Sequence, residues 1–306
     1  MVKRILDCTA SDFADMNGRE LKQSIEAAEG RTVLSEIVVT APPLYQGLTN
    51  AEFSSAFGAD LILLNVFDVN APFIQGMDGT APEEMLNRLK ELVGRPVGMN
   101  LEPVDPEAPA AEALLQLPEG RKAVRASLEK AKELGADFVC LTGNPKTGVT
   151  NRAIVKSIEV VKDVFGDDGL VIAGKMHAAG VKGESGEEIV TVEVVEQFVE
   201  AGADVVLIPG AGTVPGMTLE RVARLAEAAH RKGALVLTAI GTSQEGADED
   251  TIRRMALMNK MAGADIHHLG DAGFTGITAP ENIFAYSVAI RGRRHTYVRM
   301  AASIRR

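Results

Sequence analysis

Six ionisable or amide side chains stand within apolar runs or at their ends, and their types suit proton transfer at a carbonyl compound. These residues are Glu36, Asn100, Glu102, Lys175, His177 and His268. A lysine can form a Schiff base with a carbonyl or stabilise developing negative charge, whereas glutamate and histidine move protons. An amide can orient the substrate. The combination predicts a catalytic site if the fold brings these side chains together.

Lys175 lies near the end of the run Leu170–His177. If the large apolar side chains of this run face outward, alternation along a strand points Lys175 and His177 inward. A buried ammonium group needs a partner, and Glu36 and Glu102 are the carboxylates expected to supply it. Three roles stay open for Lys175: a Schiff base, a charged group that stabilises an enolate or phosphate, and a structural ion pair.

Other runs supply further polar side chains to the same side. Alternation places Asn100 and Glu102 inward on one run and Glu36 inward on another. Asn65 and Thr142 each stand five positions after the aspartate of a Gly-Ala-Asp triplet, and Asn144 stands two positions after Thr142. We expect these residues to bind the substrate: Asn65, Thr142 and Asn144.

His267 and His268 end the last apolar run, so one histidine faces inward and the other outward. We favour His268 as the inward one, where it would act as a general acid or base near neutral pH. A metal alternative stays open, in which Glu36, Glu102 and Asp271 hold Mg²⁺ or Mn²⁺. No clustered ligand motif supports that alternative, so no cofactor is required by the sequence.

Three glycine-bearing loops follow the sixth, seventh and eighth apolar runs. Glycine lets backbone N–H groups approach an anion, and phosphate groups often bind at this end of a barrel. The loops therefore predict a cradle for a small phosphorylated metabolite. Its expected residues are Gly212, Thr213, Gly241, Thr242 and Gly273.

The elements that must position these residues are short strands alternating with amphipathic helices. Eight near-continuous apolar runs are of the kind that a parallel sheet covered on both faces requires. The predicted strands are Thr32–Thr40, Asp60–Phe67, Pro96–Pro103, Asp137–Asn144, Leu170–His177, Asp204–Pro209, Ala234–Ile240 and Asp265–Gly270. Apolar residues at three- and four-residue spacing predict helices over Ala123–Leu134, Val192–Ala201, Leu219–Lys232 and Glu249–Ala262.

Gly-Ala-Asp precedes every second strand, at Gly58–Asp60, Gly135–Asp137, Gly202–Asp204 and Gly263–Asp265. A period of two β/α units suits an α/β fold of the closed (β/α)8 TIM-barrel type. An open Rossmann-like sheet is the alternative, but the first strand is not followed by G-x-G-x-x-G. We therefore predict one barrel domain over 1–306.

Both ends of the chain lie outside the eight units. Residues 1–31 form an N-terminal extension, with a helix near Arg19–Glu29 that covers the barrel bottom. The tail 292–306, with Arg291 before it, is rich in arginine and is predicted to be solvated or to contact another subunit. The long loops Asp68–Pro82 and Val104–Gly120 are predicted to be lids or interface elements of a homo-oligomer.

Composition excludes several classes of protein. The formal charge of -10 disfavours nucleic acid as a partner, because phosphate neutralisation needs a basic surface. No run of about 18 uncharged apolar residues and no signal-peptide pattern is present, so we expect a cytoplasmic protein without a membrane partner. Cys8 and Cys140 are the only cysteines, and Cys140 within an apolar run is expected to be a small buried residue.

The Gly-Ala-Asp strand openings and the late glycine loops resemble the phosphate-binding TIM-barrel superfamily, which includes ribulose-phosphate epimerase-like and class I aldolase-like enzymes. Ala264–His268 is similar to the epimerase pattern, in which an inward histidine follows Ala-Asp. Val171–Lys175 looks like the lysine strand of Schiff-base aldolases, although those enzymes carry the lysine on strand six or four. The Lys-x-Cys-Gly-His loop of phosphoenolpyruvate mutases and isocitrate lyases and the D-x-D-x-T motif of haloacid dehalogenases are absent. The resemblance thus implies a separate branch of the superfamily.

Residues and resemblance together predict an enzyme with lyase or isomerase chemistry on a small phosphorylated metabolite. Lys175 would be the nucleophile or electrostatic anchor, and Glu102 with His177 or His268 would carry protons. A metal-dependent hydrolase or mutase and a non-catalytic metabolite-binding protein remain the alternatives.

Overall fold

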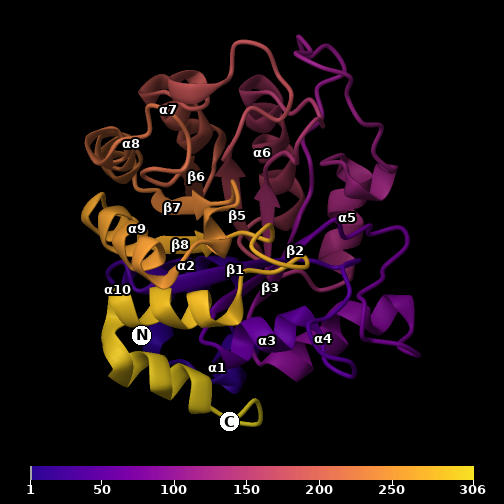
Figure 1. Cartoon of the computed structure of the whole chain (residues 1–306). Coiled ribbons are helices and arrows are strands. Elements are labelled where there is room, and N and C mark those ends of the chain that lie inside the picture. Colours follow the sequence, from indigo (N-terminus) through magenta and orange to yellow (C-terminus); the bar gives the residue numbers. More distant parts are fainter. Residues whose placement is uncertain (1) are drawn as a thin grey trace.

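The computed structural model describes residues 2–306 and shows a closed barrel of eight parallel strands in sequential order, which confirms the predicted fold class (Figure 1). Each strand pairs with its neighbours along the chain, and β8 closes on β1. The strands are β1 Thr32–Val38, β2 Leu61–Asn65, β3 Val97–Asn100, β4 Phe138–Leu141, β5 Leu170–Gly174, β6 Val205–Pro209, β7 Leu235–Ile240 and β8 Ile266–Leu269.

Ten α-helices are present within residues 2–306, and those that follow the strands surround the barrel (Figure 1). They are α1 Ala10–Ala14, α2 Gly18–Glu26, α3 Asn50–Ala56, α4 Met85–Val93, α5 Arg125–Glu133, α6 Asn151–Phe165, α7 Val192–Ala201, α8 Leu219–Arg231, α9 Glu249–Met261 and α10 Pro280–Ala301. Short 3-10 turns, η1 to η5, lie at Ile5–Asp7, Pro82–Glu84, Glu119–Arg121, Gly186–Glu188 and Gln244–Gly246. Side-chain caps, for example Thr191 at α7 and Asp248 at α9, fix several of the helix starts. None of the helices described is long and apolar enough to span a bilayer.

The repeated Gly-Ala-Asp triplets have a specific role in the barrel. Each aspartate stands just before an even-numbered strand, and its Oδ2 accepts a hydrogen bond of 2.8 to 3.0 Å from a valine N–H at the start of the preceding odd-numbered strand. The pairs are Asp60 with Val33, Asp137 with Val97, Asp204 with Val171 and Asp265 with Val236. We call these four contacts the aspartate clamps. They fix the register of β1–β2, β3–β4, β5–β6 and β7–β8.

Each clamp aspartate also has a basic partner, and the most buried one, Asp60, has two arginines. Arg291 Nη1 donates to Asp60 Oδ2 at 2.6 Å, and Arg299 Nε lies 2.7 Å from Oδ1. Both arginines come from α10, so the expectation of a solvated arginine tail is wrong for these two residues. They are buried because they anchor α10 beneath the barrel, although Gly292, with a φ of 74°, kinks the helix between them.

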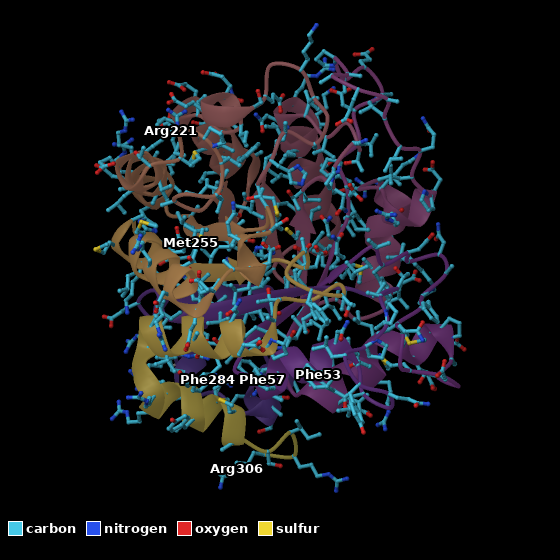
Figure 2. All side chains as sticks on the ribbon, in the orientation of Figure 1. Phe53, Phe57, Arg221, Met255, Phe284 and Arg306 are labelled. Atoms are coloured by element: carbon cyan, nitrogen blue, oxygen red, sulfur yellow. The ribbon has the colours of Figure 1, made fainter. Side chains whose placement is uncertain are left out.

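Two apolar layers follow from the alternation of side chains. Outward residues pack against the helices, and inward residues such as Leu34, Leu63 and Leu207 fill the barrel. The N-terminal residues Ile5 and Ile25 join this inner layer and close the bottom of the barrel. On the outside, α10 contacts α3, and Figure 2 labels Phe284 on α10 and Phe57, which follows the last residue of α3.

The long loops cover the opposite end, where the strands terminate. The predicted loop Val104–Gly120 folds back over the loops that follow β4 and β5, with Ala111 N–H bonded to Gly180 O and Leu115 N–H to Lys146 O. The loop after β8 lies over β1, where Val38 N–H donates to Gly276 O at 2.9 Å. We call this covered end the mouth. Strands β6 and β7 end where the sequence predicts, whereas the other six end one to three residues earlier, because the residues that follow already belong to these loops.

Candidate active site

The mouth has one polar wall and one apolar wall. Inward positions on β1 to β4 and β8, or just after these strands, carry polar side chains, whereas those on β5 to β7 carry small or apolar ones. The polar set comprises Glu36, Asn65, Asn100, Glu102, Thr142, Asn144 and His268. The alternation therefore confirms the inward placement predicted for these residues. The opposite wall is formed by Gly174, Met176, Pro209, Ala239 and Gly241.

Glu36 and His268 form a buried pair at the base of the mouth. Glu36 Oε2 lies 2.9 Å from His268 Nε2, and the two side chains are 4% and 0% exposed. Burial, together with the charges of Glu245 and Glu102, raises the pKa of Glu36 to about 8. Burial lowers the pKa of His268 to about 4. At neutral pH a single proton therefore lies between the two side chains. The neutral Glu36 carboxyl holds this proton and donates it in a hydrogen bond to Nε2 of the neutral His268 imidazole.

The second ring nitrogen of His268 is the unusual feature of this pair. Within residues 2–306, buried Nδ1 has no hydrogen-bond partner. When Nε2 accepts from Glu36, Nδ1 carries the ring hydrogen and is a donor without an acceptor. Buried polar atoms are normally paired, so this atom is available to a bound molecule.

An amide network lines the next layer toward solvent. Asn65 and Asn144 exchange hydrogen bonds of 2.8 and 2.9 Å, and Asn100 Nδ2 donates to Asn65 Oδ1 at 3.3 Å. Glu102 accepts from Asn144 Nδ2 at 2.9 Å and from Arg121 Nη2 at 2.8 Å. The network holds the Glu102 carboxylate in an ion pair, which leaves it less suited to proton transfer than Glu36.

Two further acidic residues complete the mouth. Asp271 accepts from Asn65 Nδ2 at 2.8 Å, and burial and the Glu36 charge raise its pKa to about 7. Glu245 follows β7 and is fully buried, with Oε1 accepting from Ala272 N–H at 3.0 Å. Burial also raises the pKa of Glu245. Neither Glu245 nor Arg121 is among the site residues expected from the sequence, where the only signal for Glu245 is an acidic residue four positions after Gly241.

Glu245 lies directly above His268. Gly270, just beyond the end of β8, is the next inward position after His268, and a Cβ there would come within 2.7 Å of Glu245 Oε1. The carboxylate thus fills the space that a side chain at position 270 would take. Its second oxygen, Oε2, is buried without a hydrogen-bond partner among the described residues.

Backbone strain marks the end of β2 in the same region. Val66 follows Asn65 and has a φ of 64°, a conformation that is rare for a β-branched residue. Its N–H donates to Asn65 Oδ1 at 2.9 Å, which helps to fix the Asn65 side chain. Such strain persists where the surroundings impose it, and it is concentrated at functional sites.

The prediction that Lys175 points into the barrel beside Glu36 and Glu102 is wrong. Leu170, Ile172 and Met176 belong to the inner layer, so Lys175 points outward. Its Nζ donates to Glu184 Oε2 at 2.6 Å and to Ala178 O at 3.3 Å. Both faces of the strand are apolar, so hydrophobicity does not distinguish inward from outward positions.

His177 belongs to the same loop as Lys175. Its Nδ1 accepts from Ala179 N–H at 3.0 Å, and burial, with a contribution from the Lys175 charge, lowers its pKa to about 4. His267, in contrast to His268, faces outward, where its ring bonds to Tyr286 Oη at 3.0 Å and to Gly30 O at 3.1 Å. The choice of His268 as the inward histidine is therefore confirmed.

Only part of the predicted phosphate cradle has free N–H groups. Gly212 N–H donates to Met217 O at 2.9 Å, and Thr213 N–H donates to Gly210 O at 3.2 Å. At the loop after β8, the Glu245 carboxylate occupies the Ala272 N–H, whereas the next N–H, that of Gly273, donates to no acceptor within residues 2–306. The N–H groups of Gly241 and Thr242, after β7, also donate to no acceptor in the described part of the chain, and all three residues are partly exposed.

The carboxylates do not converge as metal ligands do. Within the described chain, no group of three or more histidine, cysteine, aspartate or glutamate side chains is placed to hold a metal ion. Glu36, Glu102 and Asp271 each bond to a different neighbour. This arrangement differs from the one that the metal alternative requires.

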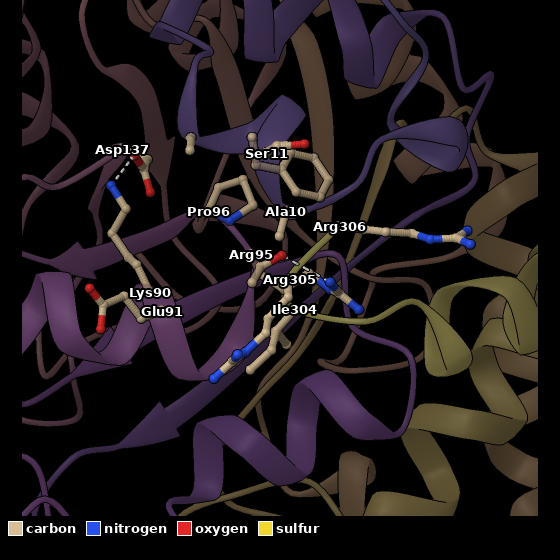
Figure 3. Close-up of a pocket in the computed structure, with 13 residues that line it drawn as sticks. Ala10, Ser11, Lys90, Glu91, Arg95, Pro96, Asp137, Ile304, Arg305 and Arg306 are labelled. Carbon is tan, nitrogen blue, oxygen red and sulfur yellow. Dashed lines mark hydrogen bonds and ion pairs between the residues drawn. The ribbon is translucent and has the colours of Figure 1, made fainter.

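A cavity of about 330 Å³ lies at the other end of the barrel (Figure 3). It is lined by Ala10, Lys90 and Arg95 near the starts of β3 and β4, and by the C-terminal Arg305 and Arg306. Lys90 is paired with Asp137, as the dashed line shows. Groups at this end of a barrel serve stability, whereas reacting groups lie at the mouth.

Solved structures with related folds are distant in sequence. A domain of a multifunctional pyruvate carboxylase from Rhizobium etli matches with a TM-score of 0.53 and 13% identity over 95% of this chain and 30% of that one. A candidate lyase/mutase from Burkholderia cenocepacia J2315 matches with a TM-score of 0.49 and 18% identity over 84% and 82%. A thiamine phosphate pyrophosphorylase from Pyrococcus furiosus gives 0.48 and 12% over 87% and 100%.

At such identities the carboxylase match shows the barrel fold alone. No curated protein matches the sequence. One family model covers almost the whole length, over residues 6–306, and its description is "Domain of unknown function (DUF7916)". The chain therefore belongs to the DUF7916 family.

Proposed function

We propose that this protein is a lyase or isomerase that moves protons next to a carbonyl group of a small metabolite, with the Glu36–His268 pair as the acid and Asp271 as the base. The observation that carries the proposal is the buried pair itself, 2.9 Å apart, with pKa values of about 8 and about 4. Pairs whose environments shift their pKa values in opposite directions are characteristic of acid–base sites.

The proposed step begins with a proton leaving carbon. Asp271, whose pKa is about 7 and which lies at the partly exposed rim, accepts this proton as a carboxylate. The C–H electron pair forms the enolate, and the oxygen takes the hydrogen from His268 Nδ1. Glu36 then passes its proton to His268 Nε2, so the charge that leaves the substrate ends on Glu36.

The amide groups position the substrate. Asn65 and Asn144 bond to each other and to acidic neighbours, so their orientation is fixed before a substrate arrives. The N–H groups of Gly241, Thr242 and Gly273 are the part of the predicted cradle that can still bind a phosphate group. A phosphorylated substrate would therefore place its phosphate over the loops after β7 and β8.

Hydrogen–deuterium exchange tests this proposal without knowledge of the substrate. The protein is incubated in D₂O with a mixture of small carbonyl metabolites, phosphorylated and not, and deuterium at carbon is detected by mass spectrometry. We expect the protein to label at least one compound, and His268→Gln to reduce the rate by about 10²-fold or more.

His267→Gln is the matched control, because His267 is equally buried with a similar pKa of about 4 but faces outward. It should lose stability and keep the exchange activity of the folded fraction. Equal loss in the two variants would contradict the proposed role of the pair. Ligand binding without any exchange would favour a non-catalytic metabolite-binding protein.

A further inference from the structure

The mouth contains more negative than positive side chains. Four acidic residues line it, namely Glu36, Glu102, Glu245 and Asp271, and Arg121 neutralises only Glu102. Lys175, expected to supply a second cation, is paired with Glu184 outside the barrel. Three buried or half-buried acids thus remain with no cationic side chain from the protein.

An unsatisfied oxygen lies within this acidic group. Glu245 Oε1 is held by Ala272 N–H above His268, whereas Oε2 is fully buried and accepts no hydrogen bond from the described residues. Thr142 Oγ1, an inward position on the opposite side, is also without a partner. An unpaired buried carboxylate oxygen is costly, so the site is complete only when a donor reaches it.

The geometry of the acidic residues limits which kind of bound group can donate to Glu245 Oε2. A metal ion needs several oxygens converging on one point, and no such group exists within residues 2–306. An ammonium group carries one charge on three directed N–H donors and suits acceptors spread over neighbouring residues. Ala272 N–H fixes Glu245 beside Asp271, which provides two such acceptors next to each other.

We propose that the mouth binds a protonated amine of the substrate between Glu245 and Asp271, one layer above the Glu36–His268 pair. This inference rests on the proposed function and names its substrate class, a small carbonyl compound that also carries an amine. Binding of the amine should also change the number of protons bound at the site. Because burial and the Glu36 charge raise the pKa of Asp271 to about 7, this carboxyl is partly protonated when the site is empty, so binding of a cation releases protons and tightens as pH rises from 6 to 8.

Two probes that differ in a single group test the proposal. 2-Aminoethyl phosphate carries the amine, and 2-hydroxyethyl phosphate replaces it with a hydroxyl. We expect the amine probe to bind at least tenfold more tightly in ligand-observed NMR titrations at pH 7.5, with proton release measured by calorimetry in two buffers of different ionisation enthalpy.

Glu245→Gln should abolish the preference for the amine, since Gln can still accept from Ala272 N–H and keep the loop in place. Asp248→Asn is the control, because it removes one charge from the same segment while asparagine still caps α9. This control should keep the tenfold preference. The unmodified protein's proton release serves as a second measurement if Glu245→Gln does not fold.

The outcomes separate the hypotheses. Equal binding of both probes, or tight binding of Mn²⁺ that excludes the amine probe, would overturn the amine site. Absence of binding by either probe, together with deuterium exchange into a carbonyl compound without an amine, would also overturn it while leaving the proposed function intact. If the unmodified protein prefers the amine probe but exchanges no deuterium into any carbonyl compound, the proposed function is refuted while the amine site stands.

Discussion

The aspartate clamps allow the same substitution to be made at equivalent positions with very different partners. At Asp60, fully buried, Asn replaces a carboxylate that accepts from Arg291 at 2.6 Å and faces Arg299 at 2.7 Å. Arg95 lies in the same buried cluster, so three guanidinium groups would remain without any carboxylate. Breaking a buried pair in this way costs about 3–5 kcal/mol.

At Asp204 the same change removes much weaker contacts. Its Oδ2 lies 3.3 Å from Lys162 Nζ and its Oδ1 3.9 Å from Lys22 Nζ, and all three side chains are 20–30% exposed. Such pairs contribute about 0.2–1 kcal/mol. Asn can still accept from the clamped valine N–H at either position, so the clamp itself is retained in both variants.

We therefore expect Asp60→Asn to lose roughly 3 kcal/mol more stability than Asp204→Asn, the difference between the two estimates. Urea unfolding followed by circular dichroism measures this difference, provided that the m-values of the two variants agree. Losses within about 1 kcal/mol of each other would refute the argument, because it predicts that burial and partner number decide the cost.

Three other measurements test the site and its surroundings. The deuterium-exchange activity should follow a narrow bell-shaped pH profile, falling below about 7 as the Asp271 carboxylate gains a proton and above about 8 as Glu36 loses its own; a flat profile to pH 9 would count against the pair. The folded state keeps a proton on Glu36 up to about pH 8, whereas the unfolded chain releases it near pH 4.5. The stability that this proton contributes is therefore fully present below pH 4.5 and is lost as pH rises to about 8. Glu36→Gln should accordingly flatten the decline in unfolding free energy between pH 6 and 8. Glu184→Gln should lower the unfolding free energy by about 2 kcal/mol or more, because Lys175 is then buried without its carboxylate. The double variant Lys175→Met, Glu184→Leu should lose less stability than Glu184→Gln alone; additive losses from the two positions would show that the residues do not interact as a pair.

Much of the fold could be predicted from the sequence because a parallel barrel repeats one pattern. Apolar runs, helical periodicity and the four Gly-Ala-Asp triplets recur at regular spacing, and each adds weight to the same architecture. The strand ends were less predictable. Glu102 and Thr142 continue the inward alternation beyond the last paired residue, so sequence pattern alone extends the strand past the hydrogen-bonded part.

The orientation of β5 shows why a site residue can be misplaced. Barrel strands are apolar on both faces, and Leu170, Ile172 and Met176 suit the inner layer as well as the outer one. The clamps would have resolved this ambiguity, because the clamped valine faces outward in every odd strand. Counting from Val171, position 175 is then outward, as the structure shows.

Glu245 and Arg121 could not be found in the same way. Both belong to three-residue 3-10 turns within loops, η5 and η3, which are too short for periodicity to assign a direction to a side chain. Their place in the mouth depends on contacts between loops, such as that of Glu245 with Ala272, which the sequence does not encode locally.

The clamps also divide the barrel into four units joined by seams. Within each unit, β1–β2, β3–β4, β5–β6 or β7–β8, an aspartate side chain ties the first strand to the second, whereas no clamp crosses from one unit to the next. Inward side chains link two of the four seams at the mouth, with Asn100 bonded to Asn65 across β2–β3 and His268 to Glu36 across β8–β1. Partial opening should therefore start at the other two seams, β4–β5 and β6–β7. The protein would come apart as pairs of strands, and a chain cut between two units should reassemble more readily than one cut inside a unit.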